Sequence, residues 1–205
     1  NIFFNKQLVL NDSDLFWPHN WPWLCGDYWY YAIINFLKEY DYIWLCEPDI
    51  YFSNENSSDF FKPFETLDFD FIGYGYGTLG ENANFFKTSK VLEGNPMTAL
   101  FGMTRLKTKL INILYKERIR LSRSFIDKKF SSDLFPNDEI FVSTTLNRMN
   151  CSIRRLENFS QFDFRLFTPD ENQAMLIEDA RKIKGDFVIH PVLDEYTFIK
   201  KKLNS

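Results

Sequence analysis

The chain has 205 residues and a mass of 24.5 kDa, and 45% of its residues are hydrophobic and 19% aromatic. This composition supplies a packed core and excludes an intrinsically disordered chain. The net charge of −4 argues against a nucleic-acid-binding surface, and no apolar run approaches the roughly 20 residues that span a bilayer. The length fits one domain over residues 1–205, or a core with an appended lobe.

The cysteines and the first residue bear on the compartment and on the limits of the chain. Cys25, Cys46 and Cys151 stand far apart and have no metal-ligand spacing. An odd number of cysteines favours buried thiols in a reducing compartment, so we expect a cytoplasmic protein. The sequence opens at Asn1 without a signal-peptide pattern, and we expect it to be part of a longer polypeptide, truncated at its amino terminus.

The amino-terminal part of the chain is predicted to contain two strands, a loop and a helix. We expect the first strand over residues 1–10, and the proline-rich, aromatic segment 17–23 is typical of a loop. Apolar residues recur at helical spacing from Asp27 onward, which predicts a helix with Asp27 as its N-cap. The apolar and aromatic run within residues 41–52 then predicts a buried strand that continues through Glu47, with Glu47 and Asp49 at its carboxyl end.

In the middle of the chain, a strand, a loop and a helix are expected in turn. Residues 59–64 predict a short helical or turn segment, and residues 68–74 alternate as a strand does. Glycines interrupt the tyrosine-rich segment 73–77, which predicts an irregular loop, either with buried tyrosines or with rings free to stack on sugars. Thr104 is placed to cap a helix with an apolar inner face made of Leu106, Leu110, Ile113 and Leu114.

The carboxyl-terminal part continues the alternation of helices and strands. A helix is predicted over residues 136–146 and a strand over 151–156. Residues 168–171 have the pattern of a capping box, which predicts a helix that ends at Gly185. A last short strand is expected over residues 187–189. This order of elements favours an α/β fold with a mixed sheet flanked by helices.

Two carboxylates, Glu47 and Asp49, follow the most apolar predicted strand. Ligands of open α/β sheets bind outside the carboxyl ends of the strands, so chemistry is expected at this position. Two acids separated by one residue can clamp a divalent cation that carries phosphates. The plainer interpretation is that both acids belong to the turn that follows the strand.

His190 is one of two histidines and directly follows the last predicted strand. A lone histidine at a strand end is more often structural than functional. Together with Glu47 and Asp49, however, its imidazole would give a set of two oxygens and one nitrogen that suits Mn²⁺.

Two further acids, Asp138 and Glu139, begin the predicted helix 136–146. A carboxylate at this position can act as a general base toward an acceptor hydroxyl, although helix N-termini favour acids in any case. A basic stretch is typical of a solvated helix face, and a surface that binds an anionic membrane or an acidic glycan is the second interpretation. The stretch comprises Lys107, Lys109, Arg118, Arg120, Arg123, Lys128 and Lys129.

Taken in order, four segments resemble the GT-A family of nucleotide-sugar glycosyltransferases. They are Glu47-Pro48-Asp49, Phe101-Gly102-Met103, Asn137-Asp138-Glu139 and His190. The resemblance implies a GT-A-like, Rossmann-like fold and transfer of a sugar from a nucleotide-linked donor, UDP-linked by expectation, to a glycan hydroxyl. It also implies that Mn²⁺ or Mg²⁺ is held by Glu47, Asp49 and His190.

The resemblance assigns roles to the remaining candidates as well. Asp138 or Glu139 would be the catalytic carboxylate, with Asp138 preferred. Gly102 would lie beside the donor sugar. The segment Gly26-Asp27-Tyr28 is similar to a motif in which a helix-start acid, here Asp27, lies near the sugar nucleotide.

Two departures from the family pattern keep other functions open. Glu47-Pro48-Asp49 replaces the commoner Asp-x-Asp, and only 46 residues precede Glu47, fewer than the family usually gives to its nucleotide-binding half. A non-catalytic glycan-binding or assembly module is therefore an alternative. A metal-dependent nucleotidyltransferase is a second alternative, although no glycine-rich basic loop follows a first strand.

Overall fold

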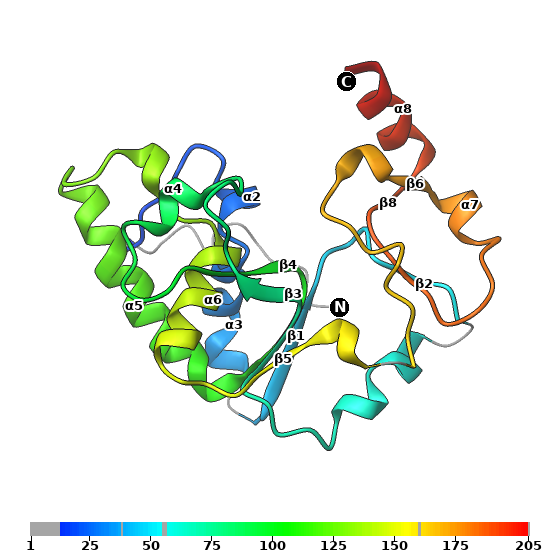
Figure 1. Cartoon of the computed structure of the whole chain (residues 1–205), viewed down its shortest axis with the longest axis horizontal. Helices are drawn as coiled ribbons and strands as arrows, with labels where there is room; N and C mark the ends of the chain where they lie inside the picture. Colours follow the sequence, from blue (N-terminus) through cyan, green and yellow to red (C-terminus); the bar gives the residue numbers. More distant parts are fainter. Residues whose placement is uncertain (1–12, 38, 55–56, 160, 205) are drawn as a thin grey trace. The chain divides into compact units, whose positions relative to one another are not determined.

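The computed structural model describes residues 13–37, 39–54, 57–159 and 161–204, and they form two compact units (Figure 1). Unit 1 comprises residues 1–45 and 69–154, and unit 2 comprises residues 46–68 and 155–205. Each unit is thus assembled from two separate stretches of chain. The strand expected over residues 1–10 lies outside the described residues, and a single domain over 1–205 stays a prediction.

Unit 1 is built around a four-stranded sheet with the order β1-β4-β3-β5. The strands are β1 (Tyr42–Cys46), β3 (Phe71–Thr78), β4 (Met97–Lys107) and β5 (Ile153–Arg155). β3 and β4 pair antiparallel. The expected α/β class with a mixed sheet and helices is therefore confirmed, and the strands predicted before Glu47 and within 151–156 are both present.

The helices of unit 1 contribute large apolar side chains to one core. Tyr28, Leu106, Leu114 and Phe141 are among its most buried members. The helical segments are α2 (Trp21–Leu24), α3 (Asp27–Ile33), η1 (Ile34–Phe36), α4 (Phe86–Ser89), α5 (Thr108–Ile126), η4 (Ser132–Leu134) and α6 (Asp138–Arg148). The short helix α2 lies in the segment expected to be a loop.

The glycine-rich segment 73–77 is part of β3, so the prediction of an irregular loop was wrong. The register of β3 against β4 shifts between Gly73 and Tyr74 and again before Gly77. Gly75 has φ +65°, a left-handed backbone that glycine adopts without steric cost. The glycines therefore bend the strand at these shifts instead of ending it.

The helix predicted to have Thr104 as its N-cap begins three residues later than expected. β4 continues to Lys107, which is the N-cap of α5. Thr104 is buried in the strand, where its Oγ1 lies 2.8 Å from the Tyr30 hydroxyl. Sheet pairing thus overrides the local pattern of a threonine before apolar residues. Most residues of the basic stretch lie in α5.

Unit 2 has two small pairs of strands. β2 (Tyr51–Phe52) pairs antiparallel with β7 (Val188–Ile189), and β6 (Met175–Leu176) pairs parallel with β8 (Val192–Leu193). Its helical segments are η2 (Ser57–Phe60), η3 (Lys62–Phe64), η5 (Leu156–Asn158), η6 (Glu171–Gln173), α7 (Ile177–Ala180) and α8 (Glu195–Asn204). The short segments η2 and η3 confirm the expectation for residues 59–64.

Phenylalanine rings packed at tilted and edge-on angles form much of the interior of unit 2. Phe60 and Phe64 are almost fully buried, and their ring centroids lie 5.3 Å apart. Phe60 also packs on Phe162, and Phe64 packs on Phe159. Aromatic pairs of this kind add stability beyond the area they bury, which helps a unit with so few strands to hold its shape.

The helix expected from residues 168–171 to Gly185 was wrong. The Asp170 N–H donates to Thr168 Oγ1, and the Asn172 N–H donates to Asp170 Oδ1. These local bonds close turns that compete with a helix. The chain then enters β6, and before Gly185 only the single turn α7 follows that strand.

Within the ranges that the structure describes, no helix combines the length and the apolar character needed to cross a bilayer.

Candidate metal centre

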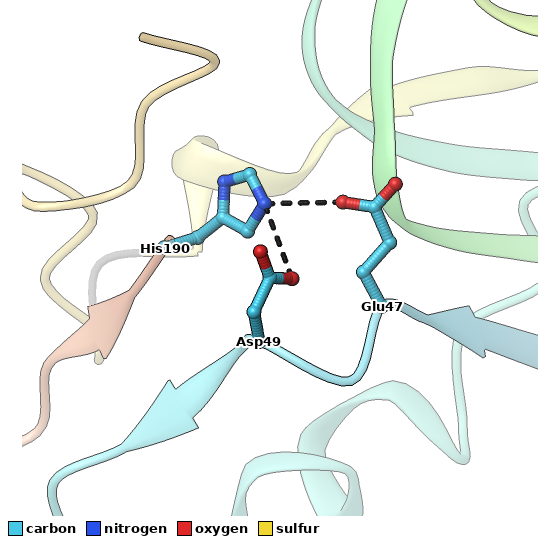
Figure 2. A group of neighbouring side chains, drawn as sticks. All are labelled: Glu47, Asp49 and His190. Carbon is cyan, nitrogen blue, oxygen red and sulfur yellow. Dashed lines mark hydrogen bonds and ion pairs between the residues drawn. The ribbon is translucent and has the colours of Figure 1, made fainter. Parts of the chain in front are cut away.

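Glu47, Asp49 and His190 converge in unit 2, as the sequence predicted (Figure 2). One ligand atom from each of them lies within 4.8 Å of the other two. The His190 Nε2 atom is 3.0 Å from Glu47 Oε2 and 3.5 Å from Asp49 Oδ1. This group could hold a metal ion.

Strand pairing brings these residues together across the chain. Glu47 follows the last residue of β1, and Asp49 precedes β2 (Figure 2). Ile189 of β7 is paired with Tyr51 of β2, so the strand end that carries His190 lies beside the turn that carries Asp49. The Val192 N–H donates to the Asp49 carbonyl at 2.8 Å and fastens the two segments on the other side of His190.

The imidazole of His190 is oriented by its second nitrogen. Nδ1 lies 2.8 Å from the Thr168 carbonyl oxygen, which only accepts hydrogen bonds, so Nδ1 carries a proton and donates it. Nε2 is therefore the atom that faces the two carboxylates and can ligate a metal as the neutral imidazole. A histidine ligand fixed by a backbone carbonyl in this way is a usual feature of protein metal sites.

Burial and the neighbouring acids have opposing effects on the pKa of His190. Burial lowers the pKa, but the hydrogen bond to Glu47 and the charge of Asp49 outweigh burial and raise it. Without a metal, the two acids thus favour the protonated form of the ring more than water does. A divalent cation would take the place of the Nε2 proton between the same oxygens.

The donor set and its exposure fit a hard to intermediate divalent cation. Two carboxylates and one imidazole are ligands that Mn²⁺ accepts. The side chains of Glu47 and Asp49 are 49% and 29% exposed, whereas that of His190 is 8% exposed. The cluster is thus anchored on the histidine side and open on the carboxylate side, where further oxygen ligands could approach.

Asp27 occupies a different environment from the one predicted. It is the first residue of α3, after the N-cap Gly26, and it is fully buried. Its two carboxylate oxygens accept hydrogen bonds from Arg118 Nε and Nη2 at 2.8 and 2.7 Å, and one of them also accepts from the Tyr31 hydroxyl. The N-cap prediction was wrong, and the carboxylate is engaged inside the core of unit 1.

Arg118 was expected on a solvated helix face, and it is instead fully buried. Burial lowers the pKa of the guanidinium, but the charge and hydrogen bonds of Asp27 raise it, with a net rise. The Arg118 side chain also donates to the Pro136 carbonyl and packs over the Phe141 ring. It joins α3, α5 and the start of α6.

Asp138 and Glu139 begin α6, and they differ in exposure. Asp138 is buried, and its carboxylate accepts from the N–H groups of Gly26 at 2.7 Å and Glu139 at 2.8 Å. Glu139 is half-buried and accepts from the Asn137 side-chain amide at 3.2 Å. Of the two, Glu139 is the one with accessible surface, and Asp138 joins the starts of α3 and α6.

The buried carboxyl of Asp138 should make unit 1 less stable as the pH rises. Burial raises its pKa, the charges of Glu139 and Asp27 raise it further, and the two backbone donors oppose this only in part. The folded protein then binds this proton more tightly than the unfolded chain, whose aspartates titrate near pH 3.9. The free energy of unfolding should fall as the pH rises above about 4 toward the folded pKa.

Urea unfolding of the wild type and Asp138→Asn between pH 4 and pH 7 measures this effect. The wild type should lose stability relative to the variant as the pH rises. Asp133→Asn, which changes an exposed aspartate, serves as the control. Parallel curves for the wild type and Asp138→Asn would contradict the prediction.

Gly26 allows the close approach between α3 and Asp138. A Cβ atom at this position would lie 2.5 Å from Asp138 Oδ2 and 3.1 Å from the Phe101 ring. We expect Gly26→Ala to destabilise unit 1 by about 1–3 kcal/mol, the usual cost of overpacking. Gly80 has open space around its position, so Gly80→Ala should change stability by less than about 0.5 kcal/mol. Equal effects of the two variants in urea unfolding would exclude the clash.

Gly102 and the aromatic segments 17–23 and 73–77 all lie in unit 1. Gly102 is buried in β4. It lies between Leu100 and Thr104, where the pairing of β4 with β3 changes register. Tyr76 is tied down, since its hydroxyl donates to Asn147 Oδ1 at 3.0 Å. Trp23 is 63% exposed, and its ring packs on Phe85. The structure therefore places Glu47, Asp49 and His190 together in unit 2, and the other candidates in unit 1.

Two contributors to the metal centre were missed in the sequence. Thr168, interpreted as a helix cap, supplies its backbone carbonyl to His190. Phe167 packs its ring against the imidazole, with 5.1 Å between the ring centroids. A carbonyl carries no side-chain signature and one phenylalanine among 23 carries little, so the sequence offered no signal for either.

Comparison with known proteins gives no family assignment. No protein-family model matches the chain, and no curated protein sequence matches it significantly.

Proposed function

We propose that this chain is a metal-dependent glycosyltransferase that moves a sugar from a nucleotide-linked donor, probed first as a UDP-sugar, to a hydroxyl of a glycan acceptor. The observation that carries the proposal is the cluster of Glu47, Asp49 and His190 at the end of β1. Its donor atoms suit Mn²⁺ or Mg²⁺, and its exposed side leaves coordination positions for diphosphate oxygens. The order of the segments that resemble GT-A enzymes supports the same reaction class and fold, and the odd number of cysteines supports a cytoplasmic setting.

Each residue of the cluster has a distinct part in the proposed reaction. Asp49 and Glu47 supply the negative charge that binds the cation, and His190 supplies a neutral nitrogen held in place by Thr168. The bound cation would neutralise the charge that develops on the leaving diphosphate. The chain's own task is therefore to hold the donor's diphosphate in one orientation.

The acceptor hydroxyl must lose a proton as it attacks the anomeric carbon. We assign this step to the carboxylates at the start of α6. Glu139 is half-buried and keeps accessible surface, so of the two it is the one whose carboxylate can take up a proton directly, whereas Asp138 is buried. In an inverting enzyme, Glu139→Gln would therefore lower turnover while donor binding stays unchanged.

Thermal unfolding with Mn²⁺, with UDP, and with both together tests donor binding. A ligand that binds only the folded state at 100 times its dissociation constant stabilises by about 2.7 kcal/mol. We expect the largest shift with both ligands present, followed by slow, Mn²⁺-dependent release of UDP from UDP-sugars. A glycan-induced shift without any response to nucleotides would favour the non-catalytic module. Release of pyrophosphate from nucleoside triphosphates would favour a nucleotidyltransferase.

A further inference from the structure

A short segment of unit 2, residues 164–168, runs alongside His190 and is bonded to it at three points. The His190 N–H donates to the Leu166 carbonyl at 3.0 Å, and the Thr168 N–H donates to the His190 carbonyl at 3.0 Å. The third bond joins His190 Nδ1 to the Thr168 carbonyl at 2.8 Å. The backbone of this segment thus fixes both the main chain and the tautomer of His190.

Phe167 lies at the centre of this segment and forms a wall for the imidazole. It is 2% exposed, and its ring is tilted by 36° against that of His190, with 5.1 Å between the centroids. On another side, its ring meets the Phe164 ring edge-on, with centroids 6.0 Å apart. Phe167 is therefore itself held by packing and cannot easily yield to a rotating imidazole.

The hydrogen bond at Nδ1 and the packing of the Phe167 ring restrain different motions of the imidazole. A single hydrogen bond at Nδ1 leaves the ring free to tilt about the line from Nδ1 to the Thr168 carbonyl. A ring packed against its face restrains this tilt and so keeps Nε2 directed at Glu47 and Asp49. Side chains locked by packing in this way make a binding site more precise without touching the ligand.

We infer that Phe167 is a positioning residue of the metal centre, which holds His190 Nε2 in the ligating orientation through ring packing. The inference rests on the proposed function only in requiring that the cluster bind a divalent cation. Removal of a residue that orients a ligand typically lowers metal affinity by 10–100-fold. We expect Phe167→Leu to raise the Mn²⁺ dissociation constant by about 10-fold.

The test measures Mn²⁺ binding by electron paramagnetic resonance of the free ion, without nucleotide or activity. Phe64→Leu is the matched control, because Phe64 is equally buried in unit 2 but packs on Phe60 and Phe159. Both variants should lose stability, and only Phe167→Leu should lose Mn²⁺ affinity. An equal loss of affinity in both variants, or no loss in Phe167→Leu, overturns the inference.

A ring-retaining variant and a spectroscopic probe separate positioning from folding. Phe167→Tyr keeps the aromatic wall, so it should bind Mn²⁺ within about 2-fold of the wild type even where its buried hydroxyl lowers stability. In the Co²⁺-loaded proteins, the visible absorption bands should change in Phe167→Leu and stay unchanged in Phe167→Tyr and Phe64→Leu. Wild-type protein that binds neither ion would overturn the proposed function together with this inference, whereas normal binding by Phe167→Leu would overturn the inference alone.

Discussion

Asp49→Asn should abolish tight Mn²⁺ binding and raise the dissociation constant by more than about 100-fold, beyond the effect of removing an outer-shell partner. Asparagine has nearly the same shape, and the backbone bond from Val192 to the carbonyl of residue 49 stays in place. What is lost is the charge of one of the two carboxylates in the cluster. Because charge is the main attraction for a hard cation, affinity should fall far more than stability.

Titration with Mn²⁺ followed by electron paramagnetic resonance measures this loss, and UDP release from UDP-sugars should fall in parallel. Asp179→Asn is the matched control, since Asp179 is an aspartate of unit 2 that pairs with Lys182 at the surface. This variant should bind Mn²⁺ as the wild type does. If Asp49→Asn retained wild-type affinity, the cluster would not be the metal site.

Asp27→Asn should destabilise unit 1 by about 3–5 kcal/mol, the usual cost of removing one partner from a buried ion pair. Arg118 would keep its charge in a fully buried position, because its pKa lies far above neutrality. Asparagine can accept a hydrogen bond with one oxygen only, whereas the aspartate accepts from Arg118 through both. The guanidinium would therefore lose both its counter-charge and one of its acceptors.

Tryptophan fluorescence during urea unfolding follows this effect in unit 1 alone, because all five tryptophans of the chain precede residue 45. Removing the pair together, as Asp27→Leu with Arg118→Met, should restore much of the lost stability, since no uncompensated charge then remains. Glu93→Gln at an exposed ion pair should cost less than about 1 kcal/mol. A double variant less stable than Asp27→Asn would contradict the account of a stranded charge.

The strands that lead to the Glu47, Asp49 and His190 cluster were predictable from the sequence because their signals are local. The apolar run before Glu47 predicts β1, and the short apolar run before His190 predicts β7. That the carboxylates and the imidazole meet was implied by the resemblance to GT-A enzymes and not by these local patterns. The sequence could not reveal the Thr168 carbonyl or the Phe167 ring, because both act through a pairing between distant segments.

The errors in the predicted fold also have physical causes. Thr104 and the segment 168–171 carry helix-cap patterns, but sheet pairing and side-chain turns satisfy the same backbone groups in other ways. Arg118 falls in a basic stretch that is typical of a solvated surface, and only its buried partner Asp27, 91 residues away, explains its position. Local sequence patterns thus predicted most helices and strands. Whether a polar side chain is buried depended on contacts with residues far away in the sequence, which these patterns do not contain.

The division of unit 2 into two stretches affects how the protein is made. Glu47 and His190 are 143 residues apart, and most of unit 1 is encoded between them. At the usual 5–20 residues per second, a ribosome needs about 7 to 30 s to travel from one to the other. During that interval, unit 1 has time to fold, while Glu47 and Asp49 still lack His190. The three side chains can therefore come together only late in biosynthesis, after the translation of His190, and any metal ion that needs all three as ligands would bind after that point.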